Sequence, residues 1–242
     1  MAFILACLSS TICLIELGGV YEEHQLRIDR MTTVNGVQAV IFDCDGVMFD
    51  SREANAAYYN HLLSRFNLSQ LGEEELDFVH MHTNRESIVY IFSRRGGEER
   101  RYLPEVLESL QGIDYSAFLG HMKIEPHLKE ILGYLRPLYR TAISTNRTTT
   151  MPLILERFGL VSCFDLVITA LNVEHPKPHP ESLWKILGTF KLEPHEAVYV
   201  GDSLIDQMAA QDADITLVAY CNPMLKAAYH IQSLLELKDI LP

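Results

Sequence analysis

Basic residues are scarce in this chain, which has 20 Lys and Arg against 32 Asp and Glu and a formal net charge of −12. An acidic surface repels the phosphate backbone of DNA and RNA, so the composition argues against nucleic-acid binding. For the same reason, any phosphate ligand needs a metal cation or a lysine beside it. Internal repeats and low-complexity tracts are missing too. The 242 residues are enough for one core, or for one core with a small accessory domain.

Cysteine is also scarce. The five cysteines are widely scattered and odd in number, and no C-x-x-C pair occurs. This pattern is typical of reduced thiols and not of a disulfide framework. We therefore expect a cytoplasmic protein.

A long apolar run without charges is missing as well. The first 17 residues are mostly apolar, but no Lys or Arg precedes them and Glu16 interrupts them. A secretory signal begins with basic residues, and a membrane span needs about 20 apolar residues. We expect no membrane partner, although a signal anchor is the alternative. Our hypothesis is that residues 1–30 are an extension outside the fold and that Met31 is the natural start.

Short runs of β-branched and other apolar residues predict strands. Helical patterns lie between the later ones and begin with proline in three of four cases. The alternation predicts an α/β fold, a doubly wound parallel sheet with helices on both faces. The predicted strands are Gln38–Phe42, Thr141–Ser144, Leu166–Thr169, Ala197–Val200 and Ile215–Ala219. The predicted helices are Pro126–Arg136, Pro152–Phe158, Pro180–Leu187 and Leu204–Ala210.

The stretch between the first two predicted strands contains no good strand and is too long for a loop. It carries helical patterns that glycines separate. We therefore expect a small all-helical cap domain, residues 51–125, inserted after the first strand of a core made of residues 31–50 and 126–242. The expected cap helices are Glu53–Phe66, Glu73–Met81, Glu86–Arg94 and Leu103–Gln111.

Polar residues follow the first four predicted strands. Ligands of an open parallel sheet bind beyond the carboxyl ends of its strands, so these residues are expected to converge on one edge. The set combines several acids with one lysine and with small hydroxyl and amide side chains. In strand order it contains Asp43 and Asp45, Thr145 and Asn146, Lys177, and Asp202 with Asp206.

This combination of side chains favours phosphoryl transfer. Mg²⁺ prefers carboxylate and carbonyl oxygens, and it neutralises the negative oxygens that protect a phosphate ester from attack. One carboxylate can attack phosphorus, and a second can move protons to and from the departing and attacking oxygens. Lysine and hydroxyl donors can hold the transferring oxygens. The residues therefore predict a magnesium site and phosphate-ester chemistry.

Four motifs in this order resemble the haloacid dehalogenase superfamily. The resemblance is to its helical-cap phosphatase branch, the type of phosphoglycolate phosphatase and β-phosphoglucomutase. The matching segments are D-C-D-G-V at 43–47, S-T-N at 144–146, K-P-H-P at 177–180 and G-D-S-L-I-D at 201–206. The resemblance implies Mg²⁺-dependent hydrolysis of a small soluble phosphomonoester through an aspartyl-phosphate, by a monomer or a homodimer.

The resemblance also implies catalytic roles. Asp43 would be the nucleophile, and Asp45 would be the general acid and base. Thr145 would hold the transferring phosphoryl group, with the backbone of Asn146 beside it. Lys177 would bridge the nucleophile and the phosphate. Because halide departs without a proton, the second acid favours a phosphatase over a dehalogenase.

The implied metal ligands are the side chain of Asp43, the carbonyl oxygen of Asp45 and the carboxylate of Asp202. Asp206 follows closely at the start of a predicted helix. A place in or near the metal site and a role as helix cap are both open for it. Gly46 fits a tight turn directly after the first strand.

Three other functions are alternatives to this one. A phosphomutase would share the core motifs and return the phosphoryl group to its substrate instead of to water. A phosphonate hydrolase would need a lysine in the first cap helix, where the chain offers only Arg52 and Arg65. A non-catalytic member that binds phosphate or a protein is the last, and the complete motif set argues against it.

Other candidate residues carry weaker signals. Arg85 could clamp a second anionic group of the substrate, or it could be a solvated surface residue. The histidine pairs His80/His82 and His175/His179 lack a matching third ligand for zinc. We expect these histidines to be surface or loop residues.

Overall fold

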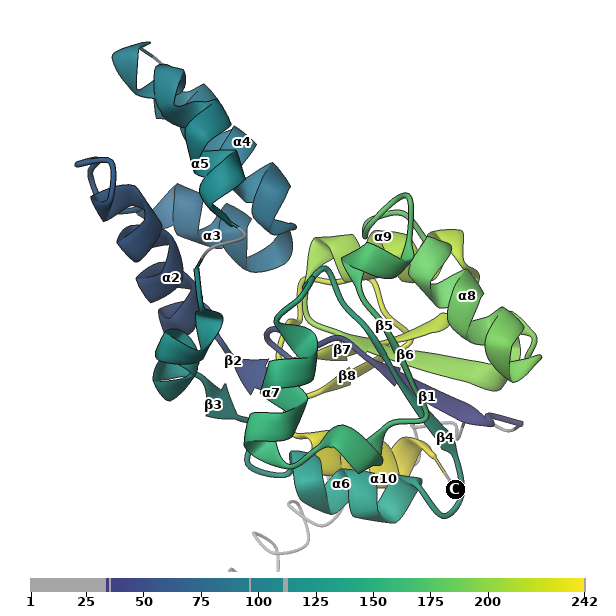
Figure 1. Ribbon diagram of the computed structural model, residues 1–242. Helices are drawn as coiled ribbons and strands as arrows, with labels where there is room; N and C mark the ends of the chain where they lie inside the picture. Colours follow the sequence, from purple (N-terminus) through teal and green to yellow (C-terminus); the bar gives the residue numbers. More distant parts are fainter. Residues whose placement is uncertain (1–33, 35, 96, 111–112, 242) are drawn as a thin grey trace, which may run out of the picture. The chain divides into compact units, whose positions relative to one another are not determined.

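The computed structural model describes residues 34, 36–95, 97–110 and 113–241 (Figure 1). The chain divides into two compact units, the larger of which is Gly36–Leu235. The described part of the smaller unit is residue 34 with residues 236–241. It contains helix α10 (Leu237–Ile240), and the Val34 N–H donates to the Ile240 carbonyl at 3.1 Å. The hypothesis about residues 1–30 and Met31 falls outside the described residues.

The larger unit is built on a six-stranded sheet in the order β5-β4-β1-β6-β7-β8. Every neighbouring pair is parallel, which confirms the predicted α/β fold class. The strand order reverses between β1 and β6, and ligands of such sheets bind at that point. The strands are β1 (Ala39–Phe42), β4 (Arg140–Ser144), β5 (Leu166–Ile168), β6 (Ala197–Gly201), β7 (Thr216–Tyr220) and β8 (Tyr229–Ile231).

Helices cover both faces of this sheet (Figure 1). Helices α8 and α9 lie on one face, where apolar residues at helical spacing pack against alternate residues of β1 and β6. Helices α6 and α7 lie on the other face. The apolar stripe of each helix therefore fixes which side of the sheet it covers. Their bounds are α6 (Leu128–Leu135), α7 (Met151–Phe158), α8 (Glu181–Phe190) and α9 (Leu204–Asp212).

A helical segment separates β1 from β4. It lies between two short strands, β2 (Phe49–Asp50) and β3 (Lys123–Ile124), which pair antiparallel. We call residues 51–122 the helical insertion. It contains α2 (Arg52–Ser64), α3 (Glu73–Met81), α4 (Asn84–Arg95) and α5 (Leu103–Ser109), with 3₁₀ turns at Gly97–Tyr102 and Tyr115–His121. The limits of the expected cap domain, residues 51–125, stay a prediction.

Shorter 3₁₀ turns complete the chain at Val161–Cys163, Ala170–Asn172, Pro194–Glu196 and Leu234–Glu236. Among the described residues, no helix is both long enough and apolar enough to cross a bilayer.

Candidate functional site

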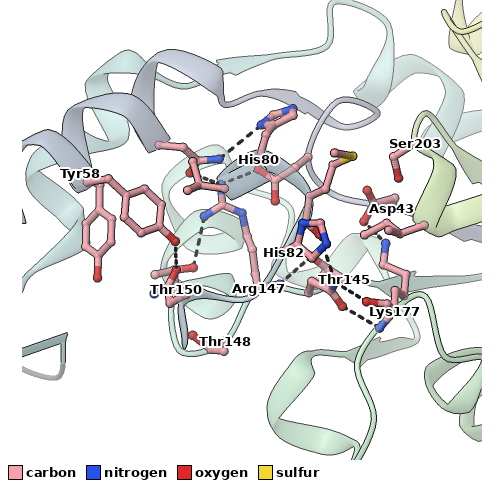
Figure 2. Close-up of a pocket in the computed structure, with 18 of the residues that line it drawn as sticks. Asp43, Tyr58, His80, His82, Thr145, Arg147, Thr148, Thr150, Lys177 and Ser203 are labelled. Carbon is pink, nitrogen blue, oxygen red and sulfur yellow. Dashed lines mark hydrogen bonds and ion pairs between the residues drawn. The ribbon is translucent and has the colours of Figure 1, made fainter. Parts of the chain in front are cut away.

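A pocket lies where the carboxyl ends of the strands meet the helical insertion (Figure 2). Charged, hydroxyl and amide side chains line it, as expected from the residues that follow the strands. The sheet edge contributes Asp43, Asp45, Thr145, Asn146, Arg147, Thr150, Lys177, Asp202 and Ser203. The helical insertion contributes Asn55, Tyr58, Tyr59, His80, His82, Asn84 and Tyr115, among others.

The turn after β1 brings the two acids of the first motif into this pocket. The Asp43 N–H donates to the Val200 carbonyl at 2.9 Å, which extends the pairing of β1 and β6 by one residue. Gly46 has φ +84°, and a Cβ atom there would lie 2.0 Å from Oδ2 of Asp202. Only glycine fits at this position, both for its backbone angle and for the close approach of Asp202.

Lys177 is the centre of a buried polar network, with 2% of its side chain exposed. Its Nζ donates to Asp43 Oδ1 at 2.6 Å, to Asp206 Oδ1 at 2.7 Å and to the Tyr199 hydroxyl at 2.8 Å. Tyr199 in turn donates to Asp206 Oδ1 at 2.6 Å. All three donors of the ammonium group are therefore used, and the lysine lies directly beside Asp43.

Asn146 fixes the loop that carries Lys177. Its Oδ1 accepts from the Lys177 N–H and its Nδ2 donates to the Lys177 carbonyl, each at 2.9 Å. Nδ2 also donates to the carbonyl of Met81 in the helical insertion at 3.1 Å. Since the side chain of Asn146 is occupied in this way, only its backbone N–H can serve a ligand. The hydroxyl of Thr145 lies beside it and accepts from the Arg147 N–H at 3.1 Å.

Three carboxylates stand close together around this lysine. Each of Asp43, Asp202 and Asp206 offers an oxygen, and these oxygens lie within 4.8 Å of one another. Burial, followed by the charge of Asp206, raises the pKa of Asp43 to about 7 and the pKa of Asp202 to about 9. Burial opposes the charge of Lys177, but Asp206 and Asp43 outweigh it and raise the lysine pKa. The single positive charge of Lys177 does not balance three carboxylates, so a bound cation would reduce the repulsion between them.

The donor set of this cluster fits a hard divalent cation. Oδ1 of Asp202 is buried and has no hydrogen-bond partner in the part of the chain that the structure describes. Both oxygens of Asp206 are already bonded, Oδ1 to Lys177 and Oδ2 to the Ser203 N–H at 3.1 Å. Asp206 is therefore the N3 residue of the capping box of α9, whose N-cap is Ser203, and a partner of the lysine. Asp43 and Asp202 are the carboxylates with oxygens to offer.

Asp45 is held by an arginine and a serine. Its Oδ1 accepts from Arg147 Nη2 at 2.6 Å and from the Ser51 hydroxyl. Burial favours the neutral acid, but the charges of Arg147 and His80 outweigh it and lower the pKa of Asp45 below its ordinary value. The predicted general acid and base is thus positioned by an ion pair. Sequence reasoning missed Arg147, although it directly follows the S-T-N motif.

The candidates with weaker sequence signals differ in their distance from the pocket. Arg85 is exposed and does not line the pocket. His80 and His82, expected at the surface or in loops, are both partly exposed and both line the pocket, His80 from α3 and His82 from the bend directly after it. His82 stacks on Phe78 with ring centroids 3.7 Å apart, and His80 Nδ1 lies 3.4 Å from Asn55 Nδ2.

The second histidine pair stays away from the pocket. The rings of His175 and His179 lie 4.8 Å apart, and His179 packs edge-on against Trp184. None of these three residues lines the pocket, as expected for loop histidines.

Comparisons with known proteins agree with this geometry. A family model described as haloacid dehalogenase-like hydrolase matches residues 40–220. A curated protein named pyrophosphatase PpaX, from Bacillus cereus, is 27% identical over 85% of this chain and 95% of its own length.

Solved structures are similar too. A haloacid dehalogenase superfamily hydrolase of subfamily IA, variant 1, from Geobacter sulfurreducens is 36% identical with a TM-score of 0.74. The match covers 85% of this chain and all of the Geobacter chain. CbbY from Rhodobacter sphaeroides, solved with phosphate, is 18% identical with a TM-score of 0.69 over 84% of this chain and 99% of its own. At that identity the likeness concerns the fold alone.

Proposed function

The chain belongs to the haloacid dehalogenase-like hydrolase family, and on this basis we propose that it is a Mg²⁺-dependent phosphatase. It hydrolyses a small soluble phosphomonoester through an aspartyl-phosphate on Asp43. The observation that carries the proposal is the buried contact between Asp43 and Lys177, 2.6 Å long, beside the carboxylate of Asp202. This contact supports Asp43 as the nucleophile, Lys177 as the cation that binds phosphate and Asp202 as a metal ligand.

Three oxygen ligands of this chain would hold Mg²⁺: the carboxylates of Asp43 and Asp202 and the carbonyl oxygen of Asp45. The unpartnered Oδ1 of Asp202 and the raised pKa values of Asp43 and Asp202 support this assignment. When bound, the ion would offset the charge of these acids and of the phosphate oxygens, which otherwise repel each other.

The residues of the pocket then have separate roles in two successive steps, the formation and the hydrolysis of the aspartyl-phosphate. The carboxylate of Asp43, whose Oδ1 accepts from Lys177, attacks phosphorus. Thr145, the Asn146 N–H and Lys177 hold the phosphoryl oxygens. Because the charge of Arg147 outweighs burial and lowers the pKa of Asp45 in the free protein, Asp45 must first take up a proton before it gives one to the leaving oxygen. It later takes one from the water that attacks the aspartyl-phosphate and releases phosphate, which restores Asp43.

The substrate is proposed only as a class. The name of the Bacillus relative, a pyrophosphatase, supports a small phosphate compound. Because helices α2 and α3 line the pocket, the helical insertion would exclude bulk water and select the substrate. A cytoplasmic location and a monomeric or homodimeric state remain predictions.

The direct test is a panel of phosphorylated metabolites and p-nitrophenyl phosphate, assayed for phosphate release with Mg²⁺. Turnover that depends on Mg²⁺ supports the proposal, and absence of release from every compound contradicts it. The phosphomutase alternative differs in the lifetime of the phosphoenzyme. An aspartyl-phosphate that survives for many seconds in water favours the mutase.

Replacing Asp45 with Asn is expected to separate the two halves of the reaction. p-Nitrophenolate departs without a proton, so Asp43 is still phosphorylated by p-nitrophenyl phosphate. Attack by water lacks its base and slows by about 10²- to 10⁴-fold. Rapid-mixing absorbance should therefore show a burst of about one p-nitrophenolate per active site, followed by slow turnover. A variant with wild-type steady-state rate would contradict the role of Asp45.

Replacing Tyr199 with Phe is expected to lower kcat/KM about tenfold and stability by about 1 kcal/mol. The substitution keeps the ring in the core but removes the hydroxyl that bonds Lys177 and Asp206, which is worth about 1 kcal/mol in a buried network. The loss should appear mainly in kcat, since Lys177 no longer keeps its orientation. Tyr220→Phe, on the adjacent strand β7, is the matched control and should leave kcat/KM within twofold.

A further inference from the structure

Arg147 has more hydrogen-bonding capacity than its partners use. Its side chain is only 8% exposed, and its Nη2 donates to Asp45 and, at 3.3 Å and 3.4 Å, to the Tyr115 hydroxyl and Asn55 Oδ1. Nη1 lies 3.3 Å from the Thr150 hydroxyl, and the guanidinium sits 5.2 Å from the centre of the Tyr115 ring. The Nε atom is buried and finds no hydrogen-bond partner in the described part of the chain. A buried, unpartnered N–H of a charged group that lines a pocket indicates a missing ligand.

The position of Arg147 identifies which part of a substrate would meet it. Asp45 must reach the oxygen that leaves, and Arg147 touches Asp45 directly. Lys177 and Asp43 lie on one side of the pocket, and Arg147 lies toward Tyr58 on the other (Figure 2). The phosphoryl group belongs with Lys177, so Arg147 lies beside the leaving group. This step depends on the proposed phosphatase function.

The surroundings of Arg147 suit an anion. The only carboxylates among the described lining residues are Asp43, Asp45 and Asp202, and Asp45 is already paired with Arg147. The helical insertion offers neutral or basic groups on this side, among them Asn55 and His80. An anionic group here would meet donors and no second carboxylate.

We propose that Arg147 binds an anionic group on the leaving-group part of the substrate. The substrate class is then phosphate compounds whose leaving group carries a carboxylate or a second phosphate. A guanidinium presents several N–H donors in one plane, which matches the oxygens of both anions better than an ammonium group does. Arg147 thus selects the substrate, whereas Lys177 serves the phosphoryl group that all substrates share.

Two small esters test this proposal, because they differ mainly in charge: 2-phosphoglycolate carries a carboxylate where 2-hydroxyethyl phosphate carries a hydroxyl. The wild-type protein with Mg²⁺ should prefer the carboxylate ester by about 30-fold in kcat/KM, typical of a charge-assisted contact. Arg147→Met should reduce the preference to less than about threefold, mainly through KM. Arg147→Lys should keep part of it.

Arg85→Met is the matched control, since Arg85 is an exposed arginine of the helical insertion that does not line the pocket, and it should keep the full preference. Equal rates with the two esters in the wild type, or an unchanged preference in Arg147→Met, would overturn the proposal. If Arg147→Met does not fold, the wild-type preference and its partial loss in Arg147→Lys decide the question.

Calorimetry keeps this test separate from the test of phosphatase activity. Both esters are titrated into Asp43→Asn protein with Mg²⁺, in the presence and absence of the Arg147 substitutions. Hydrolysis of both esters without preference contradicts the role of Arg147 but is consistent with the proposed phosphatase function. If neither ester is hydrolysed, tighter binding of the carboxylate ester that needs Arg147 supports the inference. Equal binding, or no binding, overturns it.

Discussion

Replacing Asp43 with Asn should lower the rate of p-nitrophenyl phosphate hydrolysis by about 10⁴-fold or more. The amide has nearly the shape of the carboxylate, but its oxygen is a poor nucleophile toward phosphorus. The remaining donors, Lys177 among them, still bind the substrate, so the loss should fall on kcat and much less on KM. Absorbance of p-nitrophenolate at saturating Mg²⁺ measures it. Turnover above about 1% of wild type would exclude Asp43 as the nucleophile.

This variant should remain folded, which makes the loss of activity interpretable. The asparagine oxygen can still accept from Lys177, and one of three mutually repelling carboxylates disappears. Its melting temperature without metal should therefore equal or exceed that of the wild type. Asp50→Asn is the matched control, because Asp50 belongs to the same stretch of sequence but is exposed. It should keep kcat within about twofold.

The sheet could be predicted because most of its strands are recognisable from their own residues. Buried parallel strands are short apolar runs, and five of the six were predicted with each end within one residue of its observed position. Strand β8 was missed because Tyr229–Ile231 is short and includes the exposed His230. The pairing of Phe49 with Ile124 was missed for another reason. These residues meet across the whole helical insertion, and two-residue strands carry no pattern of their own.

The site likewise has a part that local sequence patterns predict and a part that depends on contacts between distant residues. Asp43, Lys177 and Asp202 follow strands, so the topology of the sheet fixes which edge they share. Ser51 and His80 reach Asp45 only through the fold of the helical insertion, which no sequence motif describes. We expected an arginine clamp in the insertion, whereas Arg147, which we propose for this role, lies in the loop between β4 and α7.

Removing Mg²⁺ should abolish phosphate release, and Asp202→Asn should do so at ordinary Mg²⁺ concentrations. The neutral amide is a weaker ligand than a carboxylate, so Mg²⁺ affinity should fall by about 100-fold or more. Chelation with EDTA should reduce the wild-type rate by about 10³-fold, with full recovery on adding Mg²⁺. The activity of Asp202→Asn should recover partly as the Mg²⁺ concentration is raised, because the substitution lowers the fraction of protein that has Mg²⁺ bound.

Thermal unfolding measures the same binding without turnover. A ligand that binds only the folded state stabilises it by about 2.7 kcal/mol at 100 times its Kd. The wild type should therefore melt at a higher temperature with Mg²⁺ than with EDTA, and Asp202→Asn should lose most of this shift. Asp212→Asn, an exposed acid at the end of α9, should keep it. An unchanged shift in Asp202→Asn would place the metal elsewhere. High Mg²⁺ should rescue Asp202→Asn but not Asp43→Asn, because only the first variant retains the nucleophile.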